Sequence, residues 1–200
     1  MSIINNLTIR QEIINDYRAV EELTREAFWD SYNPGCDEHL MVHKLRKSSA
    51  YIPELDLVVC DKEKIVGHIL YTRSYVVDAT NQRHEFISFG PISVLPSYQK
   101  QGVGTTLIER SKEIAKSMGF KAIFIYGNDA YYHRFGFLNA EVFGISTPDG
   151  KNFEAFMGLE LIENALHGVT GRLYEDSAFE IGEEELQAFE KTFPYKEKRH

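Results

Sequence analysis

Two glycines, Gly102 and Gly104, stand where a β-type segment gives way to a run with helical period. The segment before them contains "SVLPSY", and the run after them, "TTLIERSKEIAKSMGF", repeats its apolar residues every three or four positions. The first turn of a helix leaves amide N–H groups without partners and carries partial positive charge, so phosphates bind there readily. Glycines let the backbone approach such a ligand closely. The pattern therefore indicates an anion cradle, although Gly-x-Gly alone is also common in ordinary turns.

Two widespread phosphate-binding motifs do not fit this turn. The dinucleotide fingerprint requires a third glycine three residues after the second, and Leu107 stands at that position. The Walker loop requires a lysine directly after its last glycine, but Thr105 follows Gly104. A nucleotide-binding domain is therefore disfavoured.

The hexapeptide 99–104, "QKQGVG", resembles the Gln/Arg-x-x-Gly-x-Gly/Ala motif of the GNAT acetyltransferases, which holds the pyrophosphate of acetyl-CoA. The similarity includes "VLPSY" before the motif and "YYHRFGF" at 131–137, and it is good over 86–137. The "GPISV" lead-in and "YYHRFGF" are similar to the YhbS-like subgroup of predicted acetyltransferases. Residues 1–85 agree in the order of elements only, and 138–200 agree weakly.

The resemblance implies a fold and an activity. The fold would be mixed α/β (α+β), with a mostly antiparallel central sheet of splayed strands flanked by helices. The activity would be N-acetyl transfer from acetyl-CoA, as acyl-donor co-substrate, to a primary amine of a small molecule or peptide by direct attack in a ternary complex. The alternative is a non-catalytic acyl-CoA-binding or sensing module, which would keep both glycines but need not keep a catalytic side chain.

The resemblance also implies which residues contact acetyl-CoA. Backbone N–H groups from about Gln101 to Thr105 would bind the pyrophosphate, and a main-chain N–H near Val94 would bind the thioester carbonyl. The pantetheine arm would fill the gap between two diverging strands like an added strand. Lys100 would pair with a CoA phosphate or stay solvated, and Asn128 would touch the CoA arm or cap a helix. The residues expected to bind the cofactor are Val94, Gln99, Lys100, Gln101, Gly102, Val103, Gly104, Thr105 and Asn128.

One tyrosine matches the family's Y-x-x-x-G-F pattern. Tyr132 lies five residues before Phe137, and the resemblance implies that it protonates the leaving CoA thiolate or hydrogen-bonds to the sulfur. Tyr131 is the competing candidate. Neighbouring helical residues point about 100° apart, so only one of the two can face the sulfur. The spacing favours Tyr132, and packing on a short helix is its alternative role.

The general base is less well defined. An amine is mostly protonated at neutral pH and must lose a proton before it attacks. Glu85, on the strand leading to the site, is our choice, while His84, His68 or a water chain are alternatives. Cys36 and Cys60 have no recognisable activating partner nearby, so an acyl-enzyme is disfavoured. No group of His and Cys residues has the spacing of a metal site, so we expect no metal.

The acceptor is expected to lie against the turn-rich break at 28–35, "FWDSYNPG". Trp29, Asp30 and Tyr32 are assigned to a wall for an amine, with help from the final hairpin. The alternative for Trp29 is a buried residue at a helix end.

The elements that must position these residues alternate between α and β. Strands are expected at 7–11, at 84–95 with an interruption at Gly90-Pro91, at 121–126, and in hairpins at 55–78 and around "TPDG" (147–150). Helices are expected at 15–29, 37–48, from 105 to a stop at Gly119, 128–135 and 182–193, before a frayed tail. Residues 1–162 would form the GNAT domain, with 163–200 as a C-terminal extension packed on it.

Composition limits the partners and the compartment. The net charge is −8, so the chain should repel nucleic acid and tolerate cationic amines. The N-terminus has no signal-peptide pattern and no apolar run reaches the length of a membrane span, which favours a soluble, cytoplasmic protein without a membrane partner. A homodimer is left open.

Overall fold

The structure, a computed structural model, describes residues 7–199 and divides into two compact units that alternate along the chain. Unit 1 runs to Leu70 and includes Pro91–Ile108 and the segment from Ser177 onward. Unit 2 consists of Tyr71–Gly90 and Glu109–Asp176. The predicted boundary between residues 162 and 163 falls inside unit 2, and the division into a domain and an extension stays a prediction.

The described strands pair mostly in antiparallel fashion, as the sequence predicts. They hydrogen-bond in the order β1-β2-β3-β4-β5-β8-β6, while β9 pairs with β3 and β7. The pairs β4–β5 and β7–β9 are parallel. The strand bounds are β1 (Leu7–Gln11), β2 (Leu57–Asp61), β3 (Lys64–Val77), β4 (Arg83–Val94), β5 (Ala122–Tyr126), β6 (Leu138–Asn139), β7 (Ile145–Ser146), β8 (Phe156–Glu160) and β9 (Gly171–Tyr174).

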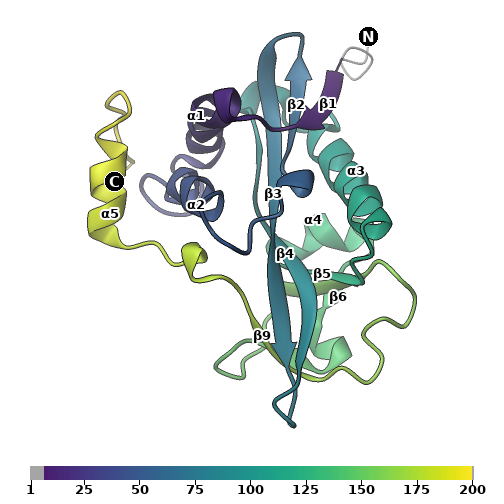
Figure 1. Cartoon of the computed structure of the whole chain (residues 1–200). Coiled ribbons are helices and arrows are strands. Elements are labelled where there is room, and N and C mark those ends of the chain that lie inside the picture. The colour runs from purple at the N-terminus through teal and green to yellow at the C-terminus, as the bar shows by residue number, and fades with distance from the viewer. Residues whose placement is uncertain (1–6, 200) are drawn as a thin grey trace. The chain divides into compact units, whose positions relative to one another are not determined.

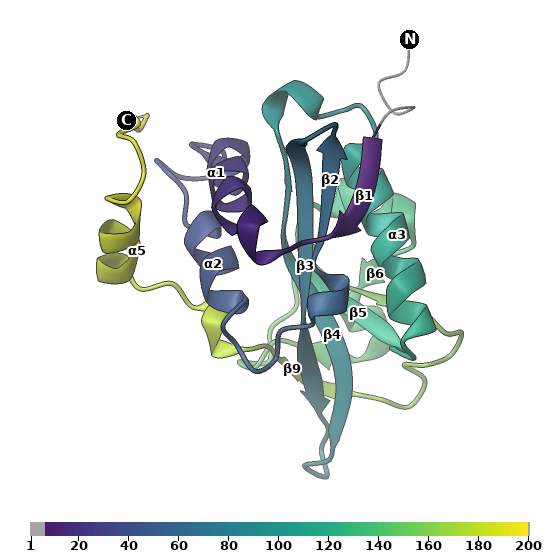
Figure 2. The same ribbon diagram turned by 45° about the horizontal axis from the view of Figure 1, so that its top comes forward.

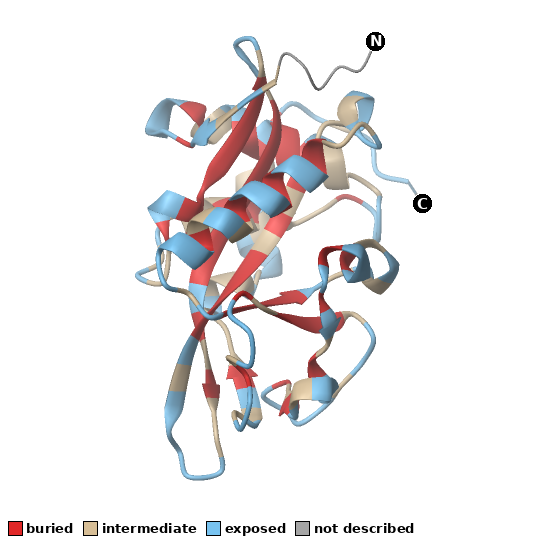
Figure 3. Cartoon of the chain, turned by 90° about the vertical axis from the view of Figure 1, so that its right-hand side faces the viewer, coloured by how far each residue is buried: buried red, intermediate tan, exposed pale blue. Residues whose placement is uncertain are grey.

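The expected helices are present; four of them are shorter than predicted, and α3 begins two residues before its predicted start. They are α1 (Tyr17–Phe28), α2 (Glu38–Leu45), α3 (Val103–Ser117), α4 (Asp129–Tyr132) and α5 (Glu183–Glu190). Single 3₁₀ turns lie at Ile14–Asp16, Pro53–Leu55, Pro96–Tyr98, His133–Phe135, Ala140–Phe143 and Ser177–Phe179. Figure 3 shows α3 buried along one side and exposed along the other, as its apolar period predicts. None of the helices described is both long and apolar enough to cross a lipid bilayer.

In unit 1, α1 and α2 cover one face of β1–β3 (Figures 1 and 2). Their apolar sides meet the sheet in a cluster that includes Val20 of α1, Val42 of α2 and Val58 of β2. β1 runs antiparallel to β2 with Leu7 opposite Asp61. Burial of such branched side chains against one sheet face is the main source of stability in a layer of this kind.

The C-terminal segment of unit 1 lies on α1 and α2. The prediction of a frayed tail is wrong, because Lys196 Nζ donates to Glu26 at 2.7 Å and Trp29 Nε1 donates to the carbonyl of Glu197 at 2.9 Å. In α5, Glu190 accepts hydrogen bonds from the guanidinium of Arg25, and Glu185 pairs with Lys44 at 2.8 Å. After the helix, Phe193 lies under the guanidinium of Arg18 at 3.5 Å. Apolar and charged contacts together hold the C-terminal segment against α1 and α2, although its many charged residues suggest a mobile tail.

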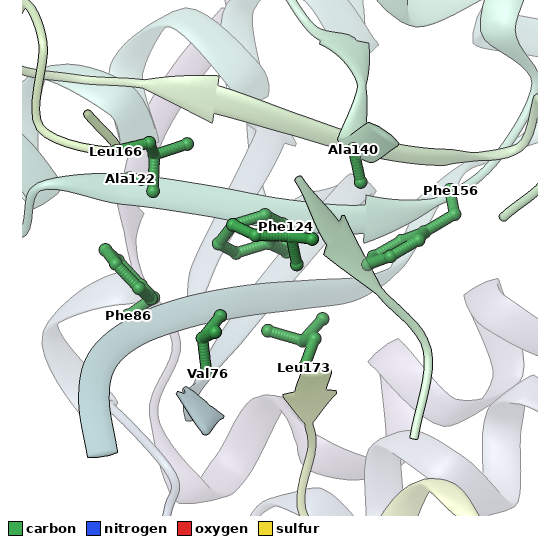
Figure 4. Packing of buried hydrophobic residues seen from close by; sticks show 9 residues of the cluster. Val76, Phe86, Ala122, Phe124, Ala140, Phe156, Leu166 and Leu173 are labelled. Atoms are coloured by element: carbon green, nitrogen blue, oxygen red, sulfur yellow. The ribbon is translucent and has the colours of Figure 1, made fainter. Parts of the chain in front are cut away.

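Unit 2 is built around a cluster of aromatic and aliphatic side chains (Figure 4). Phe124 of β5 packs between Phe86 of β4, at 5.5 Å between ring centroids, and Phe156 of β8, at 6.2 Å. Val76 of β3 and Leu173 of β9 close the cluster from the neighbouring strands. The cluster fixes the positions of β3, β4, β5 and β9 within this unit.

The parallel ladder between β4 and β5 is short. Its residue pairs are Ile87 with Ile123 and Ser88 with Phe124, although both strands continue beyond them. β4 itself runs without interruption through Gly90-Pro91, so the prediction that these residues interrupt the strand is wrong. Among the described residues, no further pair between β4 and β5 follows Ser88 and Phe124.

The final hairpin predicted around "TPDG" is only partly formed. The turn is present, because Gly150 N–H donates to Thr147 at 2.9 Å and Thr147 N–H donates to Lys151 at 3.0 Å. However, β7, which precedes the turn, pairs with β9, and β8, which follows it, pairs with β5 and β6. Turn chemistry is local, whereas the choice of strand partner depends on the sheet.

Candidate active site

The turn before α3 has the backbone of an anion cradle. Lys100 and Gly102 both adopt left-handed conformations, with φ of +58° and +89°. Such residues, alternating with right-handed ones, turn successive N–H groups towards a common point. Gly102 adopts its φ without steric cost, whereas Lys100 holds an angle that L-residues rarely adopt.

The last N–H groups of this turn, and the first of α3, have no backbone acceptor among the described residues. The first amide that hydrogen-bonds back to the turn is that of Thr106, which donates to Gly102 at 2.9 Å. Within residues 7–199, the amides of residues 101–105 have no backbone acceptor. They lie at the N-terminus of a 15-residue helix, where partial positive charge adds to their attraction for an anion.

The glutamine side chains of the turn hold its shape. Gln99 Nε2 donates to the carbonyl of Val94 at 3.1 Å, and Gln101 Nε2 donates to the carbonyl of Ser97 at 2.7 Å. At the end of β4, Leu95 N–H donates to Val66 of β3 at 3.0 Å. These bonds fasten the turn to β4 and β4 to β3, which leaves the main-chain amides, and not the glutamine side chains, to meet a ligand.

Unit 2 contains Tyr132, the predicted acid. Its side chain is 8% exposed and lies among the rings of Phe89, at 5.9 Å, and Phe137, at 5.7 Å. The ring of Tyr131 is nearly perpendicular to that of Tyr132 and lies under the guanidinium of Arg134 at 4.0 Å. The two tyrosines thus face different surroundings, as the helical geometry predicts.

The segment before Tyr132 fixes its place. Asn128 caps α4, since its Oδ1 accepts from Tyr131 N–H at 3.1 Å. Helix capping, the alternative role considered for Asn128, is therefore present. The contact of Asn128 with the CoA arm stays a prediction. Gly127, just before it, has no Cβ, and a Cβ there would overlap the Tyr132 ring. The Tyr132 ring therefore occupies the space in which any other residue at position 127 would place its Cβ.

A Gly127→Ala variant should displace the Tyr132 ring and lower kcat for acetyl transfer by about tenfold, because a displacement of about 1 Å at a catalytic group costs that much or more. The melting-temperature increase caused by acetyl-CoA should be unchanged. Gly182→Ala is the matched control, since its Cβ would meet nothing closer than Glu185 Cβ at 4.0 Å. Equal kcat values for the two variants would show that the Tyr132 ring position is unimportant.

The three side chains considered as bases differ in their surroundings. Glu85 is exposed on β4. His84 Nε2 lies 2.8 Å from Asp78 Oδ2, and this contact, with those of Thr80 and Gln82, lowers the pKa of Asp78. His84 therefore belongs to the turn between β3 and β4.

His68 belongs to a buried charge network in unit 1. Its Nε2 lies 2.9 Å from Asp56 Oδ1, and burial lowers the pKa of His68. Glu12 lies beside Asp56 and accepts two hydrogen bonds from Arg46; burial raises the pKa of Glu12 to about 9. The ligand atoms of Glu12, Asp56 and His68 lie within 4.8 Å of one another. Arg46 already supplies a cation there, which disfavours a metal ion.

The residues predicted to bind the acceptor contact the C-terminal tail of unit 1. Trp29 Nε1 donates to the carbonyl of Glu197 at 2.9 Å. Asp30 accepts from Gly35 N–H at 2.7 Å and from Arg199 N–H at 3.1 Å. Tyr32 is 78% exposed and lines a surface groove. Their role towards an acceptor stays a prediction.

Comparison with known families gives one match that spans most of these residues. The model described as "Acetyltransferase (GNAT) family" matches residues 18–137, which include the turn before α3 and Tyr132. The C-terminal segment lies outside that range.

Two curated proteins of Escherichia coli (strain K12) are similar in sequence. The uncharacterized N-acetyltransferase YhbS is 28% identical over 166 residues, which cover 82% of this chain and 93% of that protein. The uncharacterized N-acetyltransferase YjhQ is 35% identical over 97 residues, which cover 48% of this chain and 53% of that protein.

Two solved structures share the fold. The Escherichia coli GNAT family N-acetyltransferase YhbS in complex with CoA superposes with a TM-score of 0.76 at 25% identity, covering 87% of this chain and 92% of that one. A GNAT family acetyltransferase from Brucella melitensis in complex with acetyl-CoA has a TM-score of 0.71 at 24% identity, covering 87% and 98%.

Proposed function

Because the chain belongs to the acetyltransferase (GNAT) family, we propose that it transfers an acetyl group from acetyl-CoA to a primary amine of a small molecule or peptide. The observation that carries this proposal is the turn before α3. In the described part of the chain, its amides at 101–105 have no backbone acceptor and lie at the N-terminus of a long helix, an arrangement that suits a pyrophosphate. The CoA and acetyl-CoA complexes of the two similar structures support the same ligand.

The short β4–β5 ladder supports a site for the pantetheine arm. Main-chain groups beyond Ser88 and Phe124 do not pair with each other, so an amide-rich arm can hydrogen-bond to them as an added strand would. A main-chain N–H near Val94 would polarise the thioester carbonyl and stabilise the oxyanion that develops on it. Gln99 holds the carbonyl of Val94, which fixes the direction of the peptide at that point.

The reaction needs no covalent enzyme intermediate. The amine nitrogen attacks the thioester carbon, the C–N bond forms, and the C–S bond breaks with its electron pair going to sulfur. Tyr132 gives a proton, or a hydrogen bond, to the sulfur. Burial raises the pKa of the Cys36 thiol to about 12, which removes the thiolate that an acyl-enzyme would need.

The alternative is a module that binds acyl-CoA without catalysis. It would need the cradle but not a tyrosine whose ring is fitted against a glycine, as Tyr132 is. The discriminating experiment is release of free thiol from acetyl-CoA with a panel of amines, polyamines, aminoglycosides and peptide N-termini. Acetylated product with any of them supports an enzyme, and binding without product for all of them supports the module.

Acetyl-CoA at about 100 times its Kd should raise the melting temperature by about 5 to 10 °C, because a ligand that binds only the folded chain stabilises it by mass action. S-acetyl-pantetheine at the same concentration should cause almost no shift, because it lacks the pyrophosphate. The measurement is differential scanning fluorimetry, checked by calorimetric titration. Equal shifts for the two compounds would contradict a pyrophosphate site at 101–105.

A further inference from the structure

Two buried hydroxyl groups of β3, those of Thr72 and Ser74, have no hydrogen-bond partner among the described residues. Ser88 of β4 is a third buried hydroxyl in unit 2, and it interacts with the carboxyl group of Glu175. Thr72 and Ser74 are two residues apart and therefore share a face of the sheet. A buried hydroxyl without a partner costs free energy, so Thr72 and Ser74 mark a region of unit 2 that favours a bound polar group.

A carboxylate belongs to the same face. Tyr174, the last residue of β9, pairs with Tyr75 of β3, so Glu175 follows directly after this ladder, on the side of Ser74. Leu173 and Val76 pack in the same core cluster, and alternation along the two strands puts Glu175 and Ser74 on that face as well. Ser88 is close enough to Glu175 to interact with its carboxyl group.

Ser88 marks the end of the β4–β5 ladder, because it pairs with Phe124 in the last residue pair between the two strands. Glu175 therefore lies beside the point in unit 2 where the two strands stop pairing. Burial raises the pKa of Glu175 to about 7, and Ser88 opposes that shift. Tyr126 of β5 interacts electrostatically with Glu175, and its own pKa is raised by burial and by Glu175 and Asp149.

Two aromatic rings pack on Tyr126, the tyrosine that interacts with this carboxylate. Tyr126 stacks on Phe156 at 4.8 Å and on Phe153 at 5.9 Å between centroids. Tyr126 and Phe153 are 41% and 47% exposed. Exposed ring faces next to a carboxylate attract an alkylammonium group by charge and by cation–π interaction, and they cover its apolar chain.

We propose that Glu175 is the base that deprotonates the acceptor, and that the acceptor is a primary alkylammonium whose chain lies against Tyr126 and Phe153. The proposal rests on the acetyl transfer proposed above and names its substrate class and base. Glu85, the base expected from the sequence, lies three residues before Ser88 on β4 and therefore points to the opposite face. Glu175 lies outside the residues that match the family model.

The proton balance is complete without another reactant. The ammonium gives one proton to the Glu175 carboxylate, and the free amine then attacks the thioester carbon. When the C–S bond breaks, the nitrogen loses a second proton and the sulfur gains one, which gives the amide and free CoA. Glu175 finally releases its proton to solvent, so the net products are amide, thiol and one proton.

The test compares Glu175→Gln with Glu85→Gln, using the best amine from the thiol-release panel and saturating acetyl-CoA. At pH 7.5, Glu175→Gln should lower kcat/KM for the amine by roughly 30-fold, somewhat below the usual contribution of a general base because water replaces part of it. Glu85→Gln should change it little. In the wild type, kcat/KM should fall as the pH drops below about 7. In Glu175→Gln, this decrease of kcat/KM at acidic pH should be absent.

A stability measurement separates a base from a merely structural carboxylate. Because the pKa of Glu175 is higher in the folded than in the unfolded chain, the folded state binds more protons between about 4.5 and 7, and wild-type stability falls as pH rises through that window. Glu175→Gln should therefore melt at a higher temperature than wild type at pH 8.5, and its acetyl-CoA shift should be unchanged.

The outcomes are distinct. Suppose that the wild type acetylates an amine, and that Glu175→Gln keeps the wild-type kcat/KM and its decrease at acidic pH. The assignment of Glu175 as the base is then wrong, but the proposed acetyl transfer is still supported. A lower melting temperature of Glu175→Gln at pH 8.5, or a larger loss in Glu85→Gln, also overturns the assignment. If the wild type acetylates no amine in the panel, the proposed function fails, and this proposal with it.

Discussion

Gly102→Val should weaken acetyl-CoA binding by about 10³-fold and abolish the melting-temperature increase that the ligand causes. A hydrogen bond to a charged group contributes about 1.5 to 3 kcal/mol, so losing two of those to the pyrophosphate has this effect. Gly102 adopts φ of +89°, which a β-branched residue cannot hold without strain of about 1 to 3 kcal/mol. The backbone will relieve that strain by rotating, and the amides of Gly102 and Val103 will turn away from the ligand.

The control for this variant is Gly119→Val. Gly119 follows α3, has φ of +87°, and a Cβ there would have no neighbour within 4 Å. Both variants therefore carry the same backbone strain, and both should melt at a lower temperature than wild type. Only Gly102→Val should lose the acetyl-CoA shift and the heat of binding in a calorimetric titration. If Gly119→Val loses the shift as well, strain and not the cradle accounts for the effect.

The parts of the structure that the sequence predicts well depend on local rules. Strand, turn and helix at 93–117 follow from the change of period and from the glycines, and α4 follows from the capping residue Asn128. The cradle also follows, because helix N-termini have the same unpartnered amides wherever they occur. Its finer geometry does not: the left-handed Lys100 and the bond from Gln99 to Val94 depend on how the turn closes.

The parts that the sequence predicts badly depend on partners distant in the chain. β7 is adjacent to a good turn yet pairs with β9, because strand pairing is decided by the whole sheet. The tail is charged and looks frayed, but Arg18, Arg25 and Trp29 of unit 1 hold it. Glu175 has no motif around it. The signal that identifies it is its position directly after the β9–β3 ladder, on the side of Ser74, and this exists only after β9 has paired with β3.

The tyrosine assigned to the leaving group combines both kinds of information. The pattern Y-x-x-x-G-F selects Tyr132 over Tyr131, and the structure gives the physical difference between them. Tyr132 is nearly buried and packs on Phe89 and Phe137, whereas Tyr131 lies under Arg134. A substitution that removes only the hydroxyl group keeps the ring packing in both cases, so the two phenylalanine variants are matched.

Tyr132→Phe should lower kcat by roughly 10²-fold, which is the low end of general acid catalysis, with little change in acetyl-CoA affinity. The hydroxyl interacts with the sulfur more strongly as the C–S bond breaks, so its removal raises the barrier and leaves ground-state binding intact. Tyr131→Phe should change kcat little. The measurement is steady-state thiol release with an acceptor from the panel at saturating acetyl-CoA, together with the acetyl-CoA melting shift of each variant. Full activity in Tyr132→Phe, or a larger loss in Tyr131→Phe, would contradict the assignment, while a change confined to KM for acetyl-CoA would make Tyr132 a binding residue, because uniform binding does not alter kcat.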